Sequence, residues 1–476
     1  MVFNSQVFIF IFAPLAIGIY WLLPRRFRVA WLTLASYLFY AYWDWRFCGL
    51  LATVTVLTYA CALGIGSARR PTAARTWFLI ALLGNVGMLV WFKYAGLLAQ
   101  TLDSLGGALH LGRIPVPALL FPVGLSFYVF QAISYLADVY RRRAAPTRSL
   151  LQFAAFVSLF PHLAMGPLFR WREVGMQLGE LPQRLEPAKL NLGLVFFAAG
   201  LLKKVLVADN MAYFSDPLWL DWRHLVPGEA WAAALGYTVQ LYFDFAGYSL
   251  MALGLGYLLG LDLPQNFNSP YRATDIGDFW RRWHMTLSFW LRDYLFTPIA
   301  NRLAEAWRPL GFRRAALWGS QASLLVTFGI CGLWHGAAWT YAVWGLYHGG
   351  LQVVHHWLRD GLKVRWRGGW AGRIGTLLLV LLGWVLFRAE SFSCAGTMLK
   401  NMFDLPHLAA PCAIPKGYFA VAVPGLLWAV FAPNLYEFVH VRKAKPRVWT
   451  LIVLGILAAG AVLLLSDSSP FLYTQF

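Results

Sequence analysis

Apolar stretches follow one another along almost the whole chain, and short polar or basic segments separate them. A transmembrane helix needs about 20 mainly apolar residues, so the pattern predicts an all-α integral membrane protein with about 11–13 transmembrane or re-entrant helices. The main apolar stretches are residues 7–23, 29–43, 47–65, 77–98, 231–261, 315–333, 339–357, 376–386, 419–439 and 451–465. Residues 150–163 form a shorter stretch, for which we expect a re-entrant or interfacial position.

Basic residues gather in the short segments between the apolar stretches. The basic clusters are residues 24–28, 69–75, 141–143, 308–314, 359–373 and 442–447. The positive-inside rule predicts that such clusters lie in the cytoplasm. Both termini are then expected on the outer side, which is the periplasm for a protein of a bacterial inner membrane. Residues 99–117 and 391–416 are expected to be loops on that same outer side.

Composition agrees with this topology. The chain is 59% hydrophobic and only 13% charged, whereas a soluble domain carries about 25% charged residues. We therefore expect one polytopic membrane domain over residues 1–476, surrounded by membrane lipids. The net charge of +19 does not indicate a nucleic-acid partner, because the basic residues lie between membrane segments and not on one face of a soluble fold. The five cysteines show no C-x-x-C spacing, which disfavours a zinc site, and we expect no metal.

Three unusual runs occur between residues 266 and 348. They are Asn266-Phe-Asn-Ser-Pro-Tyr271, Asp278-Phe-Trp-Arg-Arg-Trp-His284 and Cys331-Gly-Leu-Trp-His335-Gly. Ionisable groups beside membrane spans are costly, so His284 and His335 are functional candidates. A histidine near its ordinary pKa can take a proton from a hydroxyl that attacks a thioester. Motifs of serine hydrolases, P-loop ATPases and zinc proteases are absent, and acyl transfer by histidine needs none of them.

Other residues in and near these runs allow both a functional and a structural interpretation. Trp334 can keep water away from His335, and Arg281 with Arg282 can attract the phosphates of a carrier such as coenzyme A. Alternatively, His335 is a packing hydrogen-bonder and the Trp-Arg-Arg-Trp run is an interfacial anchor. Asp244 either makes a packing hydrogen bond or orients a base or a substrate, and His348 fits a structural role better.

The chain resembles the membrane-bound O-acyltransferase (MBOAT) family, and within it the bacterial alginate O-acetyltransferase branch. Besides the three runs above, the motifs that carry the resemblance are Phe121-Pro-Val-Gly-Leu-Ser-Phe-Tyr, Phe160-Pro-His-Leu-Ala-Met-Gly-Pro, Gly200-Leu-Leu-Lys-Lys-Val-Leu-Val-Ala-Asp-Asn and Asp244-Phe-Ala-Gly-Tyr-Ser. The turn after Pro298 departs from the family pattern, since it reads Ile-Ala-Asn-Arg where a glycine-rich version is expected. His162 stands where glutamine is commoner.

The resemblance implies a ring of transmembrane helices around a central funnel, with His335 as the essential histidine and His284 as a second one. It also implies cytosolic acetyl-CoA as the acetyl donor, with no permanently bound cofactor. The expected donor contacts are Trp280, Arg281, Arg282, Trp283 and Asn268. The acetyl group would cross the inner membrane, and a periplasmic SGNH-type acetyltransferase, working with polysaccharide export machinery, would complete the transfer.

Several functions remain open at this point. Alginate is the leading substrate, with cellulose and peptidoglycan as alternatives for the same chemistry and D-alanyl transfer as a related reaction. A transporter that moves acetyl groups without chemistry is a second class, although no internal repeat supports it. A scaffold for a synthase complex is a third, and it predicts that both histidines are dispensable.

Overall fold

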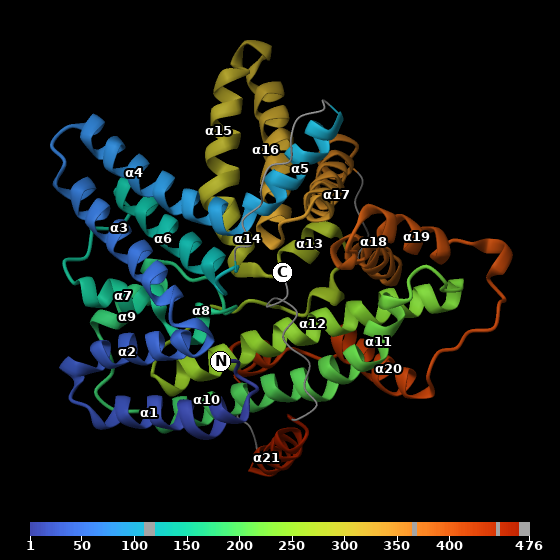
Figure 1. Ribbon diagram of the computed structural model, residues 1–476, viewed down its shortest axis with the longest axis horizontal. Helices are drawn as coiled ribbons and strands as arrows, with labels where there is room; N and C mark the ends of the chain where they lie inside the picture. Colours follow the sequence, from blue (N-terminus) through green and yellow to red (C-terminus); the bar gives the residue numbers. More distant parts are fainter. Residues whose placement is uncertain (109–119, 364–368, 444–447, 466–476) are drawn as a thin grey trace. The chain divides into compact units, whose positions relative to one another are not determined.

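The computed structural model describes residues 1–108, 120–363, 369–443 and 448–465. These residues form helices and no strands, which confirms the all-α prediction (Figure 1). Parts of two basic clusters, residues 364–368 and 444–447, lie outside the described residues. So does the C-terminus, whose expected periplasmic position stays a prediction.

The described chain divides into two compact units. The first comprises residues 1–197 and 249–264, and the second comprises residues 198–248 and 265–476. Two helices contribute residues to both units: α10 (Pro187–Leu202) and α12 (Pro227–Leu258).

The first unit contains nine further helices and three π-helical turns within its described residues. They are η1 (Phe8–Phe12), α1 (Ala13–Leu22), α2 (Arg25–Asp44), α3 (Phe47–Ser67), α4 (Pro71–Leu89), η2 (Val90–Tyr94), α5 (Ala95–Ala108), α6 (Leu125–Tyr140), α7 (Leu150–Ser158), α8 (Phe160–Leu163), η3 (Trp171–Gly175) and α9 (Met176–Gly179). Helix α6 is buried at every position from Leu125 to Val139, because its sequence is largely apolar on all sides. Gly124 precedes it at φ 77°, where an added Cβ would strike the carbonyl oxygen of Leu163.

The second unit holds all three runs that the sequence singles out. Its remaining elements are η4 (Lys203–Asp209), α11 (Asn210–Leu220), η5 (Pro270–Arg272), α13 (Ile276–Trp280), α14 (Met285–Leu291), η6 (Arg292–Phe296), α15 (Thr297–Ala306), η7 (Arg308–Leu310), α16 (Phe312–His335), α17 (Trp339–His356), η8 (Trp357–Gly361), α18 (Trp370–Arg388), α19 (Phe392–Met402), η9 (Leu405–His407), α20 (Lys416–Phe431), η10 (Glu437–Val441) and α21 (Val448–Leu463). Helices α16, α17 and α18 pack in sequence, and α15 and α16 form a long hairpin (Figure 1). Gly345 allows the close approach of α16 and α17, because a Cβ there would strike the carbonyl oxygen of Phe328.

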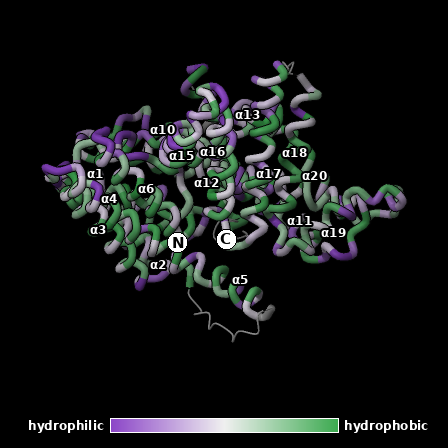
Figure 2. The backbone as a smooth tube through the Cα atoms, turned by 90° about the horizontal axis from the view of Figure 1, so that it is seen from above, coloured by the Kyte–Doolittle hydropathy of each residue, from purple (hydrophilic) through white to green (hydrophobic). Residues whose placement is uncertain are grey.

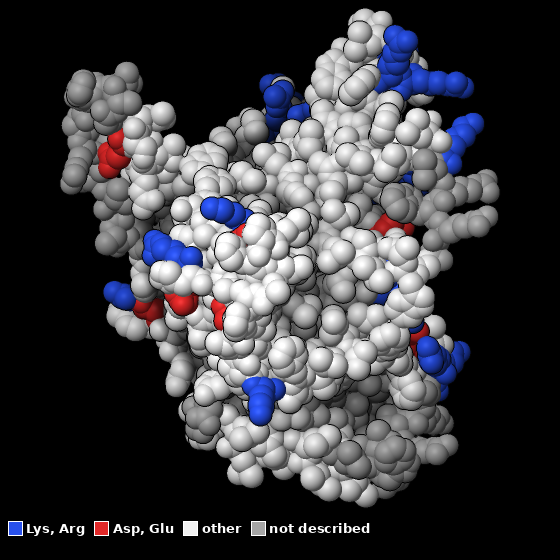
Figure 3. Space-filling view, turned by 90° about the vertical axis from the view of Figure 1, so that its right-hand side faces the viewer, with Lys and Arg blue, Asp and Glu red and all other residues white. Residues whose placement is uncertain are grey.

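Five helical segments are long and apolar enough to cross a membrane. They are Phe47–Ser67, Pro71–Gly106, Pro187–Leu220, Phe312–His335 and Trp370–Arg388, and shorter apolar helices cover Phe8–Leu22, Lys416–Phe431 and Leu454–Leu463. Hydrophobic positions dominate the helices (Figure 2), and charged side chains are few and scattered on the face seen in Figure 3. The total of 11–13 membrane segments stays a prediction.

Two expected loops contain helix. Residues 99–108, expected to begin a loop, continue α5, since no proline interrupts them and Leu102 and Leu105 keep a helical spacing. The expected loop 391–416 contains α19, whose N-cap Ser391 accepts a hydrogen bond from the backbone N–H of Cys394 (3.1 Å). A side-chain cap of this kind offsets the cost of an unpaired N–H at the start of a helix.

Candidate active site

The first candidate histidine lies in the break between two short helices. Asp275 caps α13 by accepting a hydrogen bond from the N–H of Asp278 (2.7 Å), and Asp278 in turn accepts one from Arg282 Nε (2.9 Å). His284 follows at φ 42° and ψ 52°, immediately before α14. This left-handed conformation is uncommon for a residue with a side chain, so the break is built to place His284 and is not a simple continuation of helix.

The second candidate histidine is the last residue of α16. Gly336 leaves the helix in an extended conformation, so His335 marks the C-terminal end of a candidate membrane span. His335 is buried, with 4% of its surface exposed. Its ring contacts include Trp334 (4.9 Å between centroids), Trp344 (5.1 Å) and Phe387 (5.4 Å).

The structure brings the two histidines together. The ring centroids of His284 and His335 are 6.3 Å apart in an edge-to-face arrangement. Trp334 also contacts His284 at 6.0 Å, and Phe245 of α12 packs edge-on against it at 4.7 Å. The two imidazoles therefore lie side by side in one buried cluster of mostly aromatic side chains.

One ring nitrogen of His284 is hydrogen-bonded and the other is not. Its Nδ1 lies 3.0 Å from Oδ1 of Asn266, whereas its buried Nε2 has no hydrogen-bond partner among the described residues. Burial lowers the pKa of His284 to about 3. The imidazole is therefore neutral near pH 7, which is the form that can accept a proton.

The third histidine, His348, lies deeper in the aromatic packing. It is fully buried and contacts the rings of Trp344 (5.1 Å), Trp280 (5.2 Å) and Trp384 (6.1 Å). Neither ring nitrogen has a hydrogen-bond partner among the described residues. Trp344 contacts both His335 and His348 and separates them by one aromatic layer.

The fourth polar candidate, Asp244, belongs to a buried ion cluster. Lys204 Nζ lies 2.7 Å from Asp244 Oδ1 and 2.8 Å from Asp209 Oδ1, and all three side chains are almost inaccessible. This cluster joins α12 to η4. The ion pair with Lys204 accounts for the burial of Asp244.

The five expected donor contacts take different positions. Trp280 and Trp283 are buried in the aromatic core, and Trp283 packs on Trp384 at 4.8 Å. Arg282 is held by Asp278, and Asn268 accepts a hydrogen bond from Asn434 (2.6 Å). Of the five, Arg281 presents the most exposed cation, with 62% of its side chain accessible.

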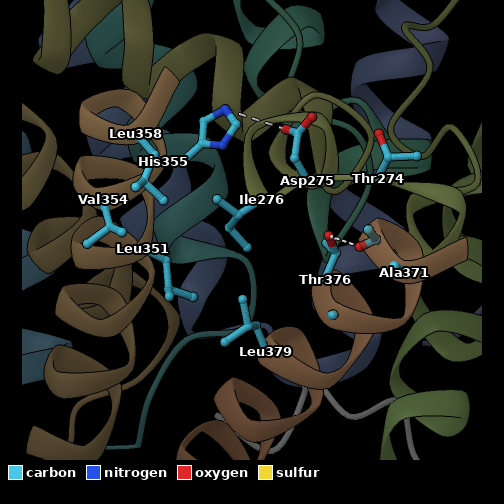
Figure 4. A pocket seen from close by; sticks show the side chains of 12 residues that line it. Thr274, Asp275, Ile276, Leu351, Val354, His355, Leu358, Ala371, Thr376 and Leu379 are labelled. Carbon is cyan, nitrogen blue, oxygen red and sulfur yellow. Dashed lines mark hydrogen bonds and ion pairs between the residues drawn. The ribbon is translucent and has the colours of Figure 1, made fainter. Parts of the chain in front are cut away.

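A cavity of about 200 Å³ lies between α13, α17 and α18 (Figure 4). Its walls are mainly apolar, with Leu351, Val354 and Leu379 among them. At one end of the cavity His355 Nε2 lies 3.6 Å from Asp275 Oδ1 (Figure 4). The carboxylates of Asp275 and Asp360 and the guanidinium groups of Arg359 and Arg281 all act on His355, so charges of both signs lie close to the mainly apolar cavity.

The cavity lies next to the aromatic cluster. Leu351 follows His348 by one helical turn on α17, and Leu379 precedes Gly383 by one turn on α18. An added Cβ on Gly383 would come within 2.6 Å of His348 Nε2. One helical turn therefore separates the cavity wall from His348.

Sequence reasoning missed two aromatic residues of α18 and the partner of His284. Trp384 and Phe387 are almost fully buried and line the histidine cluster. The sequence feature that could have revealed them is the occurrence of two aromatic residues one helical turn apart in an otherwise aliphatic span. Asn266 stood in a motif, but nothing local in the sequence indicated a hydrogen bond to His284. Within the described residues no group of three or more His, Cys, Asp or Glu side chains is arranged to hold a metal.

Comparison with known proteins decides the family. A model described as the membrane-bound O-acyltransferase family, MBOAT, matches residues 92–370, which include both histidines and the breaks that place them. This chain belongs to the membrane-bound O-acyltransferase family. As an MBOAT protein it is an O-acyltransferase and a multi-pass membrane protein.

Relatives of this MBOAT chain carry related names. The probable alginate O-acetylase AlgI of Azotobacter vinelandii is 41% identical over 100% of both chains. The peptidoglycan O-acetyltransferase of Helicobacter pylori is 34% identical over 85% of this chain and 80% of its own. The teichoic acid D-alanyltransferase of Bacillus subtilis is 29% identical over 58% of this chain and 71% of its own.

Proposed function

We propose that this protein passes acetyl groups from cytosolic acetyl-CoA across a bacterial inner membrane for the O-acetylation of an exported polysaccharide, with alginate as the leading substrate. The names of the full-length relatives support this choice. The observation that carries the chemistry is the edge-to-face packing of the rings of His284 and His335, whose centroids lie 6.3 Å apart in a buried aromatic cluster.

The chemistry is the attack of a hydroxyl on a thioester. The hydroxyl oxygen forms a bond to the acetyl carbonyl carbon, and the carbon–sulfur bond of acetyl-CoA breaks. His335 accepts the hydroxyl proton during the attack and returns it to the departing thiolate, which leaves as coenzyme A thiol. A thioester is already activated, so the transfer requires neither a metal nor a serine nucleophile. The aromatic walls keep water from competing for the acetyl group.

The donor side of the site is assigned to the cavity beside α13. The apolar walls suit the slender arm that joins the thioester to the nucleotide of coenzyme A, and the exposed Arg281 suits its phosphates. In this assignment Trp280 and Trp283 shape the path as core residues, while Arg282 and Asn268 hold the turn. The cavity wall lies one turn from His348, which puts His348 between the donor path and His335.

The acceptor side requires a route to the periplasm. We propose that both termini are periplasmic and that a periplasmic SGNH-type acetyltransferase receives the acetyl group and works with the export machinery. Peptidoglycan and cellulose are alternative final substrates for the same chemistry. A transporter that moves acetyl groups without cleaving the thioester is the alternative of another class.

Replacement of His335 tests the proposal. A strain that makes the acetylated polymer receives wild-type protein, His335→Ala or the control His356→Ala. His356 is a partly buried histidine at the C-terminal end of α17. We expect His335→Ala to lower acetyl content by about 100-fold or more at unchanged membrane abundance, and the control to retain it.

A second assay separates an enzyme from a transporter. Purified protein in lipid nanodiscs is incubated with labelled acetyl-CoA, the periplasmic SGNH-type acetyltransferase and polysaccharide oligomers. The proposal expects release of coenzyme A thiol and label on oxygen, both lost in His335→Ala. Wild-type acetylation by His335→Ala, or label that crosses a vesicle membrane still attached to coenzyme A, would reject the proposal.

A further inference from the structure

The side chain of Asn266 holds the segment that carries His284. Its Oδ1 lies 3.0 Å from His284 Nδ1, 2.9 Å from Thr286 Oγ1 and 3.4 Å from the backbone N of Thr286. Its backbone carbonyl accepts a hydrogen bond from the N–H of Met285 (2.8 Å). Only 1% of Asn266 is exposed, so these contacts are shielded from water.

The contacts determine which end of the amide faces His284. The backbone N–H of Thr286 can only donate, so the amide atom near it must be the oxygen. That same oxygen faces His284 Nδ1, and a carbonyl oxygen has no proton to give. Nδ1 must therefore carry the proton and donate it to Asn266. A neutral imidazole has one N–H, so Nε2 carries the lone pair.

The Nε2 lone pair is buried and needs a donor. His284 is fully buried, and Nε2 has no hydrogen-bond partner among the described residues. A buried acceptor left without a donor costs about 1–3 kcal/mol. The ring of His335 packs edge to face with the ring of His284. A hydroxyl that enters to be acylated is a donor of the required kind.

The backbone of His284 is strained in a way that agrees with a functional role. A residue with a side chain at φ 42° and ψ 52° costs about 1–3 kcal/mol unless its surroundings hold it. Here the bonds from Met285 and Thr286 to Asn266 hold the segment on its C-terminal side, and Asn266 therefore sets both the position and the tautomer of the imidazole.

We infer that Asn266 is a positioning residue that keeps His284 in its Nδ1–H tautomer, so that Nε2 accepts a hydrogen bond from the acceptor hydroxyl. This inference rests on the proposed function. It gives the two histidines different tasks: His284 orients the hydroxyl through its fixed lone pair, and His335 takes the proton.

The test compares Asn266→Asp with Thr286→Val in the purified protein. Aspartate keeps the shape and still accepts the same hydrogen bonds, but its charge favours the imidazolium of His284, and an adjacent carboxylate raises a histidine pKa by about 1–3 units. In the plot of kcat/KM against pH, we expect the acidic limb of Asn266→Asp to move up by at least about one pH unit. Thr286→Val removes a neighbouring hydrogen bond and keeps the one to His284, so its limb should stay at the wild-type pH.

Nitrogen-15 NMR of labelled histidine reads the tautomer without any acyl transfer. His284→Ala assigns the signal, and the wild-type spectrum should show a protonated Nδ1 and an unprotonated Nε2. A protonated Nε2 in the wild type, or an Asn266→Asp variant whose acidic limb coincides with that of the wild type, overturns the inference. Wild-type protein that transfers no acetyl group rejects the proposed function instead, while the NMR spectrum still decides the tautomer.

Discussion

The rings of His284 and His335 meet edge to face with their centroids 6.3 Å apart. One ring lies in a strained break between two short helices and the other at the end of a candidate membrane span. Two imidazoles that meet in one buried aromatic cluster can both act on the same hydroxyl, whereas two distant ones cannot. This relationship makes the two residues energetically dependent on each other, which can be measured.

The dependence should appear as non-additive losses. His284→Ala and His335→Ala should each lower the initial rate of acetyl transfer by about 100-fold or more, and the double variant should lose little beyond the larger single loss. The control cycle pairs His335→Ala with His356→Ala, for which independent effects are expected. If the fold losses in rate of the two single variants multiply in the double variant, His284 and His335 act separately.

The cavity beside α13 should govern donor affinity. An added Cβ at Gly375, on its lining, meets no atom within 4 Å, so the side chain of Gly375→Leu starts in open space and should narrow the cavity. We expect KM for acetyl-CoA to rise about tenfold, which corresponds to about 1.4 kcal/mol, with kcat little changed. The measurement is the rate against acetyl-CoA concentration.

Gly350→Leu is the matched control for the cavity. It makes the same substitution on α17, also with no atom within 4 Å of the added Cβ, but away from the cavity lining. Both variants gain similar helix propensity. An equal KM in the two variants would place the donor elsewhere.

The buried cluster around Lys204 should contribute chiefly to stability. Asp244→Asn removes one of the two carboxylates near Lys204 Nζ, while Asp209 still pairs with it. Weakening a buried bond to a charged group costs about 1.5–3 kcal/mol. We expect a clear fall in the thermal midpoint in detergent. Lys189→Met breaks the more exposed pair with Asp262 and should cost less than about 1 kcal/mol. Lost activity with an unchanged midpoint in Asp244→Asn would instead indicate a direct role in the site.

Acid should destabilise the protein partly through His284. The residue precedes α14, outside the five candidate spans, and burial lowers its pKa to about 3 from an ordinary value of about 6.5. The unfolded chain then binds a proton below pH 6.5 that the folded protein does not, so stability falls with pH in this window. From pH 6.5 to 5 the loss is about 2 kcal/mol.

Thermal midpoints at the two pH values check this effect. His284→Asn tolerates the left-handed backbone and cannot titrate, so its midpoint should fall less on acidification than that of the wild type. An equal fall in both proteins would show that His284 does not contribute to the acid sensitivity.

The sequence by itself determined the fold class and the family, and it singled out His284 and His335 as candidates. Long apolar stretches exist as helices because a chain in lipid must satisfy its backbone hydrogen bonds within itself. The cost of an ionisable group beside such stretches pointed to His335 and His284, and the motifs around them carried the resemblance. Local signals of this kind are read directly from residue order.

Only the tertiary structure decided what each polar group faces. That Asn266 holds His284, that Lys204 joins Asp244 to Asp209, and that Phe387 lines His335 depends on segments far apart in the chain. Hydropathy reports whether a residue is buried, but not which neighbour it meets. A hydrogen bond requires a donor and an acceptor about 3 Å apart, and packing between distant helices sets that distance.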